Sequence, residues 1–593
     1  MNQAHHVDDH CHANVDEAGL LPAGRYVAPL HSIYTCSFAL TCSDCSPALH
    51  APTMSAIPRS KLAELGRRHH MSQAALSGVL SEINDLYDET GELPDRASPS
   101  TIKRARTNNV RVDTPYGPLF REVHCPRLKG AYKYITIVHP AALLWYLVQH
   151  CAAFSEYFAE QMRSVPIVAR ARKLSVALYS DEITLGNVIK VRNTRKVQAI
   201  YWSIHQLGTI ALQSTTLWFT LSCLRSSLVE DLDGDMSEFM KIVMNSFYDG
   251  TSNLCTGGIM IGGIMYVASL DILVGDEKSI KQCWACKGSG GNLICLLCRN
   301  VVHIKGAAAL APGGGFCVDA SESDPEKFVV HTDESIAELM AELSRASVSM
   351  KKTPFLKFCV DTGFNYVPDG VLMCPIVQPR PVFMTMWDWM HVYMVKGILN
   401  QELGLLVSKL YCSDLNLDYR NLHAFLQKFQ WPTRVRSVTG QNIFVARETL
   451  DDASDAKGDA SELRSAYKVV QLFFNGPDVL GACEADPTDA NVDLAAAIAC
   501  YNSLCAVIDC LVRVSECATV DPCDLQDAII SDLRHRVNVY GEESVRPKQH
   551  HSMHLPEQLA RHKILLSCWV HERKHKEIKK YERYLNNTAG PSL

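Results

Sequence analysis

Two closely spaced pairs of cysteines constrain the fold of this 593-residue chain more than any other feature of its sequence. The stretch "CWACKGSGGNLICLLC" carries them in the pattern C-x2-C-x8-C-x2-C, as Cys283, Cys286, Cys295 and Cys298. Two thiolates separated by two residues can reach the same metal ion, and tetrahedral zinc takes four such ligands. Either all four thiolates close one structural zinc site, or one pair shares an ion with two distant histidines. Free thiols without a metal are the alternative.

Histidines near the end of the sequence offer the other half of a mixed site. In "RPKQHHSMHLPEQLARH", His550 and His554 are four residues apart, so they share one face if this segment is helical. A histidine pair on a polar helix face is the alternative interpretation. These two histidines could complete a Cys2His2 site with Cys295 and Cys298, and His551 is an alternative ligand.

Composition limits the class of protein. With 47% hydrophobic residues the chain can bury a large core, and its length predicts two to four domains. The net charge is −6, so binding to nucleic acid would depend on local basic patches. We expect no secretion signal and no membrane span, because the most apolar run, "LGTIALQSTTLWFTLSCLRSSL", is interrupted by polar residues. The 23 cysteines then predict mostly free thiols in a reducing compartment.

The N-terminal part divides into two predicted segments. Residues 1–60 are rich in histidine and acid without an apolar period, which predicts a disordered tail. Residues 61–125 show helical spacing and then a short basic helix, in which Lys103, Arg104 and Arg106 would contact DNA as part of a helix-turn-helix. A small helical subdomain with a solvated basic face is the alternative.

The middle of the chain predicts an α/β unit. Between residues 126 and 300, three β-rich runs (173–182, 195–207 and 215–227) precede a helical pattern at 234–250 and another apolar run at 262–277. Three strands, a helix and a strand are the opening order of an RNase H-like α/β domain, in which carboxylates at strand ends converge. Residues 301–540 predict a large, mainly helical insertion, and residues 541–593 a C-terminal helical segment that completes the core.

Three acids stand at positions suited to metal-dependent phosphoryl transfer. Asp181 and Asp276 each end a strand-like run, and Glu572 lies within the basic stretch "HERKHKEIKK". Carboxylates that hold two Mg2+ or Mn2+ ions can activate a nucleophile and stabilise a leaving oxygen. Asp388 precedes His391 by three residues, either as a further active-site acid or as part of a hydrogen-bonding arrangement among aromatic residues. Solvated carboxylates are the alternative for each acid.

Four stretches together resemble one protein family. Residues 178–204, 273–298, 387–406 and 547–580 resemble conserved blocks of the DDE transposases of cut-and-paste DNA transposons. The CACTA-like and Plavaka/KDZ-like groups are the most similar, as are the transposon-derived proteins abundant in dinoflagellate genomes. The second acid departs from the family pattern D-x-P-A, because "DEKS" stands here. Asp388 is therefore an alternative second acid.

The resemblance implies a function and a set of residues. It implies an RNase H-like core, a catalytic triad of Asp181, Asp276 and Glu572 with Mg2+ or Mn2+, and a zinc-stapled C-terminal helix. The implied zinc ligands are Cys295, Cys298, His550 and His554, with Cys283 and Cys286 as alternatives. Transposon ends and target DNA would be the partners of a nuclear protein that could form homo-oligomers, with Arg573, Lys574 and Lys576 neutralising phosphates. A catalytically decayed or domesticated DNA- or protein-binding relic is the alternative function, and a zinc-stapled structural protein is a third.

Overall fold

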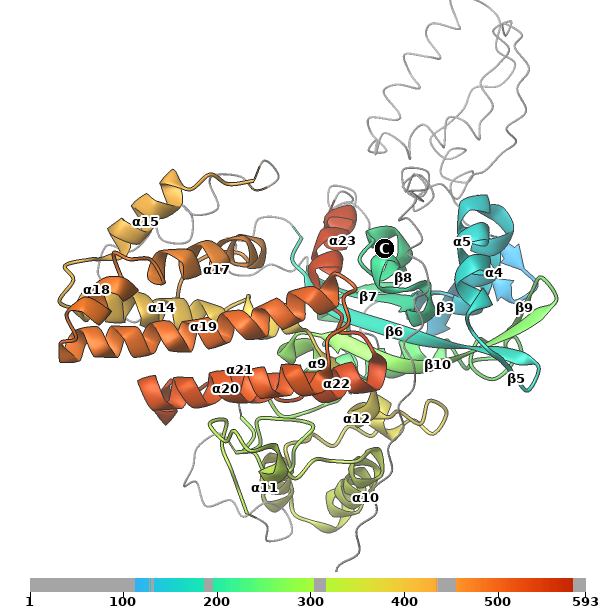
Figure 1. Cartoon of the computed structure of the whole chain (residues 1–593). Helices are drawn as coiled ribbons and strands as arrows, with labels where there is room; N and C mark the ends of the chain where they lie inside the picture. Colours follow the sequence, from blue (N-terminus) through green and yellow to red (C-terminus); the bar gives the residue numbers. More distant parts are fainter. Residues whose placement is uncertain are drawn as a thin grey trace, which may run out of the picture.

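The computed structural model describes residues 112–579, apart from 127, 129–132, 186–195, 289, 303–315, 433–434 and 436–454. The predicted N-terminal tail, most of the predicted helix-turn-helix and its residues Lys103, Arg104 and Arg106 therefore lie outside the described residues. Within that range the chain is a mixed α/β protein with a curled mixed sheet and many helices (Figure 1).

The main sheet has the strand order β11-β10-β6-β7-β8. Strands β6, β7 and β8 pair antiparallel, whereas β10 pairs parallel with both β6 and β11. The short strands β5 and β9 pair antiparallel with β6 and β10. The bounds are β5 (Ile167–Val168), β6 (Ala171–Ile183), β7 (Val197–Ile204), β8 (Phe219–Arg225), β9 (Ile259–Ile261), β10 (Ile264–Gly275) and β11 (Thr385–Trp387).

Strand β7 shows why these sequences form a central sheet. All eight of its residues are buried, so both of its faces are covered, and the run is rich in β-branched and aromatic side chains. Two small hairpins precede the sheet, and β4 lies beside β8, where Ser222 Oγ donates to Thr136 O at 2.8 Å. The hairpin strands are β1 (Asp113–Thr114), β2 (Gly117–Pro118), β3 (Phe120–His124) and β4 (Tyr134–Val138).

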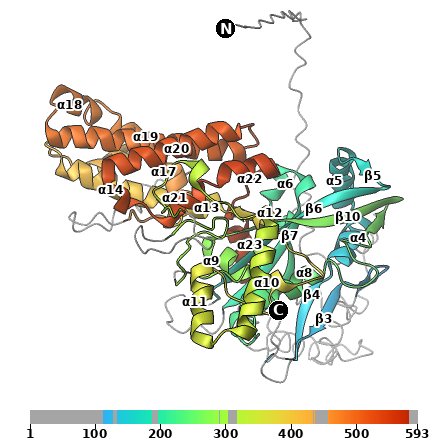
Figure 2. The same cartoon turned by 90° about the horizontal axis from the view of Figure 1, so that it is seen from below.

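Helices lie on opposite sides of the sheet. In both views α4 and α5 lie at one side, and the long helices from α14 to α20 lie together at the other (Figures 1 and 2). The helices around the sheet are α4 (Pro140–His150), α5 (Ala152–Arg163), α6 (Thr209–Leu212), α7 (Ser226–Val229), α8 (Asp235–Asn245), α9 (Glu277–Cys283), α10 (Asp333–Ser349), α11 (Lys352–Thr362), α12 (Pro381–Met384) and α13 (Trp389–Tyr393).

The remaining helices form the helical part and the C-terminal segment. The former comprises α14 (Ile398–Cys412), α15 (Tyr419–Lys428), α17 (Ala460–Phe474), α18 (Leu480–Ala485), α19 (Asp489–Ser515) and α20 (Pro522–Tyr540). The C-terminal segment, residues 546–579, comprises α21 (Pro547–Ser552), α22 (Leu555–His562) and α23 (Trp569–Lys579). Helix α19 is long and apolar enough to cross a membrane, but half of its most apolar stretch is buried, and it packs against α14, α17 and α20 as a core helix.

Residues 301–540 are mainly helical, as expected, but they are not only an insertion. Strand β11 lies within this range and pairs with β10 through Leu273↔Thr385, Val274↔Met386 and Gly275↔Trp387. A three-residue strand is too short to show a hydrophobic period, so the sequence pattern did not indicate it. The core of the sheet therefore continues into the region predicted as insertion, and Asp388 directly follows its edge strand.

A buried cluster of charges joins α14 to α20. Arg536 donates to Glu402 at 2.6 Å, both side chains are 1% exposed, and Tyr540 donates to the same carboxylate at 3.1 Å. Asp532 lies nearby and is also buried, with Ser503 Oγ 3.3 Å away. Burial and the neighbouring Glu402 raise the pKa of Asp532 to about 8, although Arg536 opposes the shift. The Arg536 guanidinium is thus the positive charge for both Glu402 and Asp532. Asp532 is therefore protonated at neutral pH.

This arrangement predicts a loss of stability as the pH rises from about 4 to about 8. Because the folded-state pKa of Asp532 exceeds the unfolded-state value, its contribution is complete below about pH 4 and is lost as pH rises through about pH 8. Between pH 6 and pH 8, the free energy of unfolding of the wild type should fall by about 2 kcal/mol more than that of Asp532→Asn. Urea unfolding followed by circular dichroism measures the difference.

A matched control is Asp493→Asn, whose side chain is 63% exposed on neighbouring α19. This variant should follow the wild-type pH profile. Parallel profiles for the wild type and Asp532→Asn would contradict the assignment of a protonated Asp532.

Candidate functional site

Two cysteines and two histidines from distant segments meet in the interior. The ligand atoms of Cys295, Cys298, His550 and His554 all lie within 4.8 Å of one another, and all four side chains are buried. His554 Nε2 is 3.4 Å from Cys295 Sγ, 3.5 Å from Cys298 Sγ and 3.2 Å from His550 Nε2. Tetrahedral zinc with ordinary bond lengths separates such ligand atoms by about 3.3–3.6 Å. The cluster could therefore hold a metal ion such as zinc.

Local structure explains how the histidines come together. Pro547 occupies the first turn of α21, and the helical turn continues past its end, because Met553 N donates to His550 O and His554 N donates to His551 O. His550 and His554 therefore keep the i, i+4 relation of a helix face. Burial lowers the pKa of His550 and keeps its ring neutral, which is the form that binds metal.

The pKa values of the two thiols, Cys295 and Cys298, are also shifted by their surroundings. Burial alone would raise the pKa of Cys295, but the neighbouring Cys298 thiol and the rings of His554 and His550 lower it well below its usual value. The hydrogen bond to Cys295 raises the pKa of the Cys298 thiol well above its usual value, and burial adds to this shift. The two thiols of the pair thus differ in acidity, and a bound cation would favour the thiolate form of both.

The alternative ligands lie elsewhere. Cys283 and Cys286 are buried outside the cluster, and the Cys286 thiol faces Trp284 O at 3.9 Å. His551 points away from the cluster, because its ring stacks on Trp387 at 4.4 Å and its Nε2 lies 3.4 Å from Ile294 O. Among the alternatives left open by the sequence, the geometry thus favours the mixed Cys/His set.

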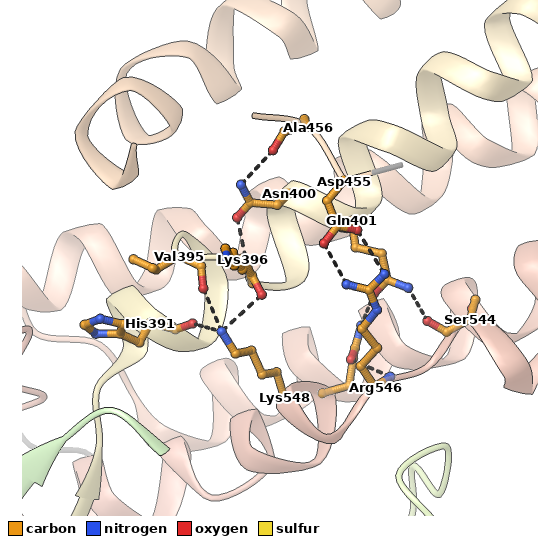
Figure 3. Close-up of polar contacts among 12 residues, drawn as sticks. His391, Val395, Lys396, Asn400, Gln401, Asp455, Ala456, Ser544, Arg546 and Lys548 are labelled. Carbon is orange, nitrogen blue, oxygen red and sulfur yellow. Dashed lines mark hydrogen bonds and ion pairs between the residues drawn. The ribbon is translucent and has the colours of Figure 1, made fainter. Parts of the chain in front are cut away.

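The residues just before this cluster attach it to the helical part (Figure 3). Arg546 makes two hydrogen bonds to Asp455, at 2.8 and 2.9 Å. The ammonium group of Lys548 donates to three carbonyl oxygens at the end of α13 and in the following turn: His391 O and Val395 O at 2.7 Å and Lys396 O at 3.1 Å. The segment that carries His550 is therefore fixed on both sides of its first turn.

The register of the sheet places three acids in one row. Val274 of β10 pairs with Tyr179 of β6, so Asp276 and Asp181, each two residues further on, are level with each other. Gly275 pairs with Trp387 of β11, so Asp276 is also level with Asp388. Neighbouring strands lie about 4.8 Å apart. The backbone thus presents Asp181, Asp276 and Asp388 side by side across β6, β10 and β11.

The fourth acid reaches this row from α23. Ligand atoms of Asp181, Glu572 and His575 lie within 4.8 Å of one another. His575 Nδ1 is 3.8 Å from Asp181 Oδ2 and 3.9 Å from Glu572 Oε2. His575 was not predicted as a site residue, although Glu572 and His575 form the E-x-x-H spacing that metal-binding helices use.

Packing of α23 on the sheet sets this approach. The ring of His571 stacks on Tyr179 with 3.7 Å between centroids and meets the edge of Trp218 at 4.1 Å. Burial lowers the pKa of His571 well below its usual value, so the ring packs as a neutral aromatic group. The Tyr179 hydroxyl in turn donates to Asp181 Oδ2 at 2.9 Å and orients that carboxylate.

Electrostatics at the acids favour a bound cation. Burial, together with the neighbouring Asp276 and Glu572, raises the pKa of Asp181 to about 7, although the Tyr179 hydroxyl bond opposes the shift. Burial also raises the pKa of Glu572, against the effect of His391. The cluster is therefore short of positive charge near neutral pH, and its carboxylate oxygens are the ligands that Mg2+ prefers.

Asp388 has a different environment from the other acids. Its side chain is 1% exposed, and its Oδ1 accepts hydrogen bonds from Met390 N at 3.0 Å and Cys568 N at 3.1 Å. Its Oδ2 pairs with His391. Burial alone would lower the pKa of His391, but Asp388 raises it to about 9. Of the two interpretations left open by the sequence, the geometry favours the hydrogen-bonding arrangement, although Asp388 lines the same cleft as Asp276.

That cleft has a volume of about 770 Å³ and lies beside Asp276. Its lining combines Asp276 and His391 with the lysines Lys278, Lys281, Lys396 and Lys548. Lys281 pairs with Glu277 at 2.5 Å and Lys278 with Glu182 at 3.7 Å, so these two cations are already balanced in part. The cleft therefore offers acids and lysines side by side, as a metal-bound phosphate group would require.

The basic residues of α23 differ in their exposure. Lys576 is exposed, whereas Lys574 is buried and donates to Thr215 O at 3.0 Å, which removes it from the expected DNA-facing surface. Arg573 is exposed and donates to Gln213 O at 2.9 Å. The helix thus uses part of its positive charge to bind the loop before β8 rather than solvent.

Neither a protein-family model nor a curated protein matches this chain.

The Cys/His cluster predicts the metal content of the protein. We expect purified protein to hold about one zinc ion per chain, since the four ligands complete one tetrahedral site. His550→Ala and Cys298→Ser should each reduce the zinc content to near zero and lower the thermal midpoint by at least about 5 °C, because metal binding contributes to folding. Elemental analysis and differential scanning fluorimetry measure both effects.

Cys286→Ser is the matched control, because Cys286 is a buried thiol outside the cluster. It should retain its zinc. Loss of zinc in this variant, or full zinc content in His550→Ala, would overturn the assignment of ligands.

Proposed function

We propose that this chain is a transposon-derived, DDE transposase-like protein that cleaves and transfers DNA strands at Asp181, Asp276 and Glu572. The observation that carries the proposal is the meeting of acids from three distant segments. Asp181 and Asp276 are level on adjacent strands, and Glu572 reaches Asp181 from α23 within 4.8 Å. Acids almost 400 residues apart in sequence have no structural need to gather, since like charges repel.

The strand order supports an RNase H-like core. Three antiparallel strands, β6 to β8, are followed by β10 and β11 parallel to β6, on its other side. This is the order expected of that fold, with the first acid on the first strand, the second after the fourth and the third on a later helix. The helical part from α14 to α20 then occupies the place of an insertion between the last strand and the helix that carries Glu572.

The three acids, together with the cleft beside Asp276, suit phosphodiester chemistry. Two divalent cations held by Asp181, Asp276 and Glu572 would activate a water or a DNA 3′-hydroxyl and stabilise the leaving oxygen. Tyr179 orients Asp181 through its hydroxyl, and the backbone N–H of Ser279 holds Asp276 Oδ1 at 2.6 Å. Lys278 and Lys396 would attract the phosphate backbone, whereas the ammonium group of Lys548 is held by three carbonyl oxygens.

The zinc cluster supports the same proposal from outside the cleft. It joins the loop after α9 to α21, and α9 directly follows Asp276. A zinc ion bound there would staple the C-terminal segment, with Glu572 at its end, to the strand that carries the second acid. The proposal further implies a nuclear protein that acts on transposon ends and target DNA, with self-association.

The first test is metal-dependent nicking of supercoiled plasmid DNA. We expect cleavage by the zinc-loaded protein with Mn2+ or Mg2+. Asp181→Ala, Asp276→Ala and Glu572→Ala should each lower the rate at least about 100-fold, because each removes a ligand from a shared metal site. Asp493→Ala, at an exposed position of α19, is the control, and it should cleave at the wild-type rate.

Two other outcomes would overturn the enzymatic proposal. Salt-sensitive DNA binding without cleavage by folded, zinc-loaded protein would identify a decayed or domesticated binding protein. Zinc content without DNA binding or cleavage would identify a zinc-stapled structural protein.

A further inference from the structure

We propose that Asp388 is a positioning residue, which fixes the start of α23 through Cys568 and thereby sets Glu572 against Asp181. The inference rests on the proposed function only for the role that it gives to Glu572. It assigns Asp388 a task outside the metal site, although this acid stands in the same row as Asp181 and Asp276.

One carboxylate oxygen holds the first turns of two helices. Asp388 Oδ1 accepts from Met390 N, at the start of α13, and from Cys568 N, which lies 180 residues later in the chain. Cys568 O in turn accepts from Glu572 N at 2.9 Å, which closes the first turn of α23. Glu572 is thus connected to the end of β11 by two successive hydrogen bonds.

The second oxygen of Asp388, Oδ2, allows the carboxylate to stay charged although it is buried. It pairs with His391, which supplies a neighbouring positive charge for a carboxylate that is only 1% exposed. An isolated buried carboxylate would be protonated or would draw in water, and it would then hold the two backbone donors less firmly. The Cys568 thiol is also buried and completes the surroundings of Asp388.

The chain before α23 is held along the free edge of β11. Gln558 accepts a hydrogen bond from Trp387 N at 3.1 Å, and Met386 Sδ accepts one from Leu566 N at 3.3 Å. These contacts place residues 558–566 on the edge of the sheet. The bond from Cys568 to Asp388 is the last of this series, and it decides where the chain turns into α23.

Apart from the bond to Asp388, α23 is anchored by the stack of His571 on Tyr179 and by hydrogen bonds from the side chains of Arg573 and Lys574 to Gln213 O and Thr215 O. These two side chains are long and flexible, so they fix the position of the helix along its axis less firmly than a bond to the backbone of Cys568 does. The stack of His571 on Tyr179 is a face-to-face contact, which tolerates sliding. Hydrogen bonds weaken steeply when their geometry changes. The directional bond to Asp388 therefore determines how far Glu572 lies along the sheet, whereas the aromatic stack determines which face of the helix meets the sheet.

A pair of tryptophans reports this contact directly. Trp389 follows Asp388 and Trp569 follows Cys568, and their rings lie 4.9 Å apart at an angle of 75°. Two indoles this close and inclined give an exciton signal in the circular dichroism spectrum. Subtraction of the Trp569→Phe spectrum from that of the full chain isolates the signal, which does not depend on activity.

The test uses substitutions of Asp388 that remove either its hydrogen-bond acceptor oxygen or its negative charge. Asp388→Ala removes the acceptor, so the exciton signal should fall by more than half and the affinity for Mn2+, measured by electron paramagnetic resonance, by at least tenfold. Asp388→Asn keeps an acceptor oxygen and should retain most of both. The control is Asp333→Ala, which removes a carboxylate that accepts from Val382 N and Phe383 N and lies away from α23; both readouts should stay at the wild-type values.

Two outcomes of the exciton measurement would overturn the inference. A folded, zinc-loaded Asp388→Ala with an unchanged exciton signal would do so, as would an Asp388→Asn variant that loses the signal equally. If Asp388→Ala does not fold, Asp388→Glu replaces it, because the charge is kept and the acceptor is displaced by one methylene; an unchanged signal there overturns the inference. Failure of the wild type to bind Mn2+ would instead overturn the proposed function, and the exciton signal would still test the position of α23.

Discussion

The parallel pairing of β10 with both of its neighbours is the constraint on which the rest of the structure depends. It aligns the ends of β6, β10 and β11, and each of these ends carries an acid. A shift of one residue in either pairing would turn one acid to the opposite face of the sheet, because side chains alternate along a strand. A register shift between Leu270 and Ile272 moves β10 by one residue against β6. Because this shift precedes the acids along the strand, it brings Asp276 level with Asp181.

The C-terminal segment completes the site by burying groups that its sequence shows as basic. His550, His551, His571 and His575 are all buried, and burial lowers their pKa values, so these rings pack as neutral aromatic groups or potential ligands. Lys574 is buried as well and binds a backbone carbonyl. A stretch that looks like a solvated cationic helix therefore has an interior face, on which desolvation keeps the histidines neutral, whereas Arg573 and Lys576 stay exposed.

Sequence patterns predicted the parts of the site that local spacing encodes. The Cys-x-x-Cys pair and the histidines four residues apart were predicted to meet, and the structure brings them together in one buried cluster. The α/β class and the run of helices after residue 301 were also predicted. Strand β11 was missed because three residues carry no period, and the surroundings of Asp388 could not be predicted because they depend on Cys568, 180 residues away. His575 was missed because its E-x-x-H spacing with Glu572 lies within a run of basic residues, which is typical of a solvated helix face.

The Cys/His cluster and the row of acids are parts of one assembly. The ring of His391 pairs with Asp388, whereas its carbonyl oxygen binds Lys548, two residues before His550 on α21 (Figure 3). Helix α13 therefore contacts the row of acids through a side chain and the metal-ligand segment through its backbone. Because the same C-terminal segment continues through the edge of β11 to Cys568 and Glu572, closing it over the sheet forms both clusters together. A metal ion in the Cys/His cluster would stabilise the closed segment, and with it the geometry of the acids, without contacting any of them.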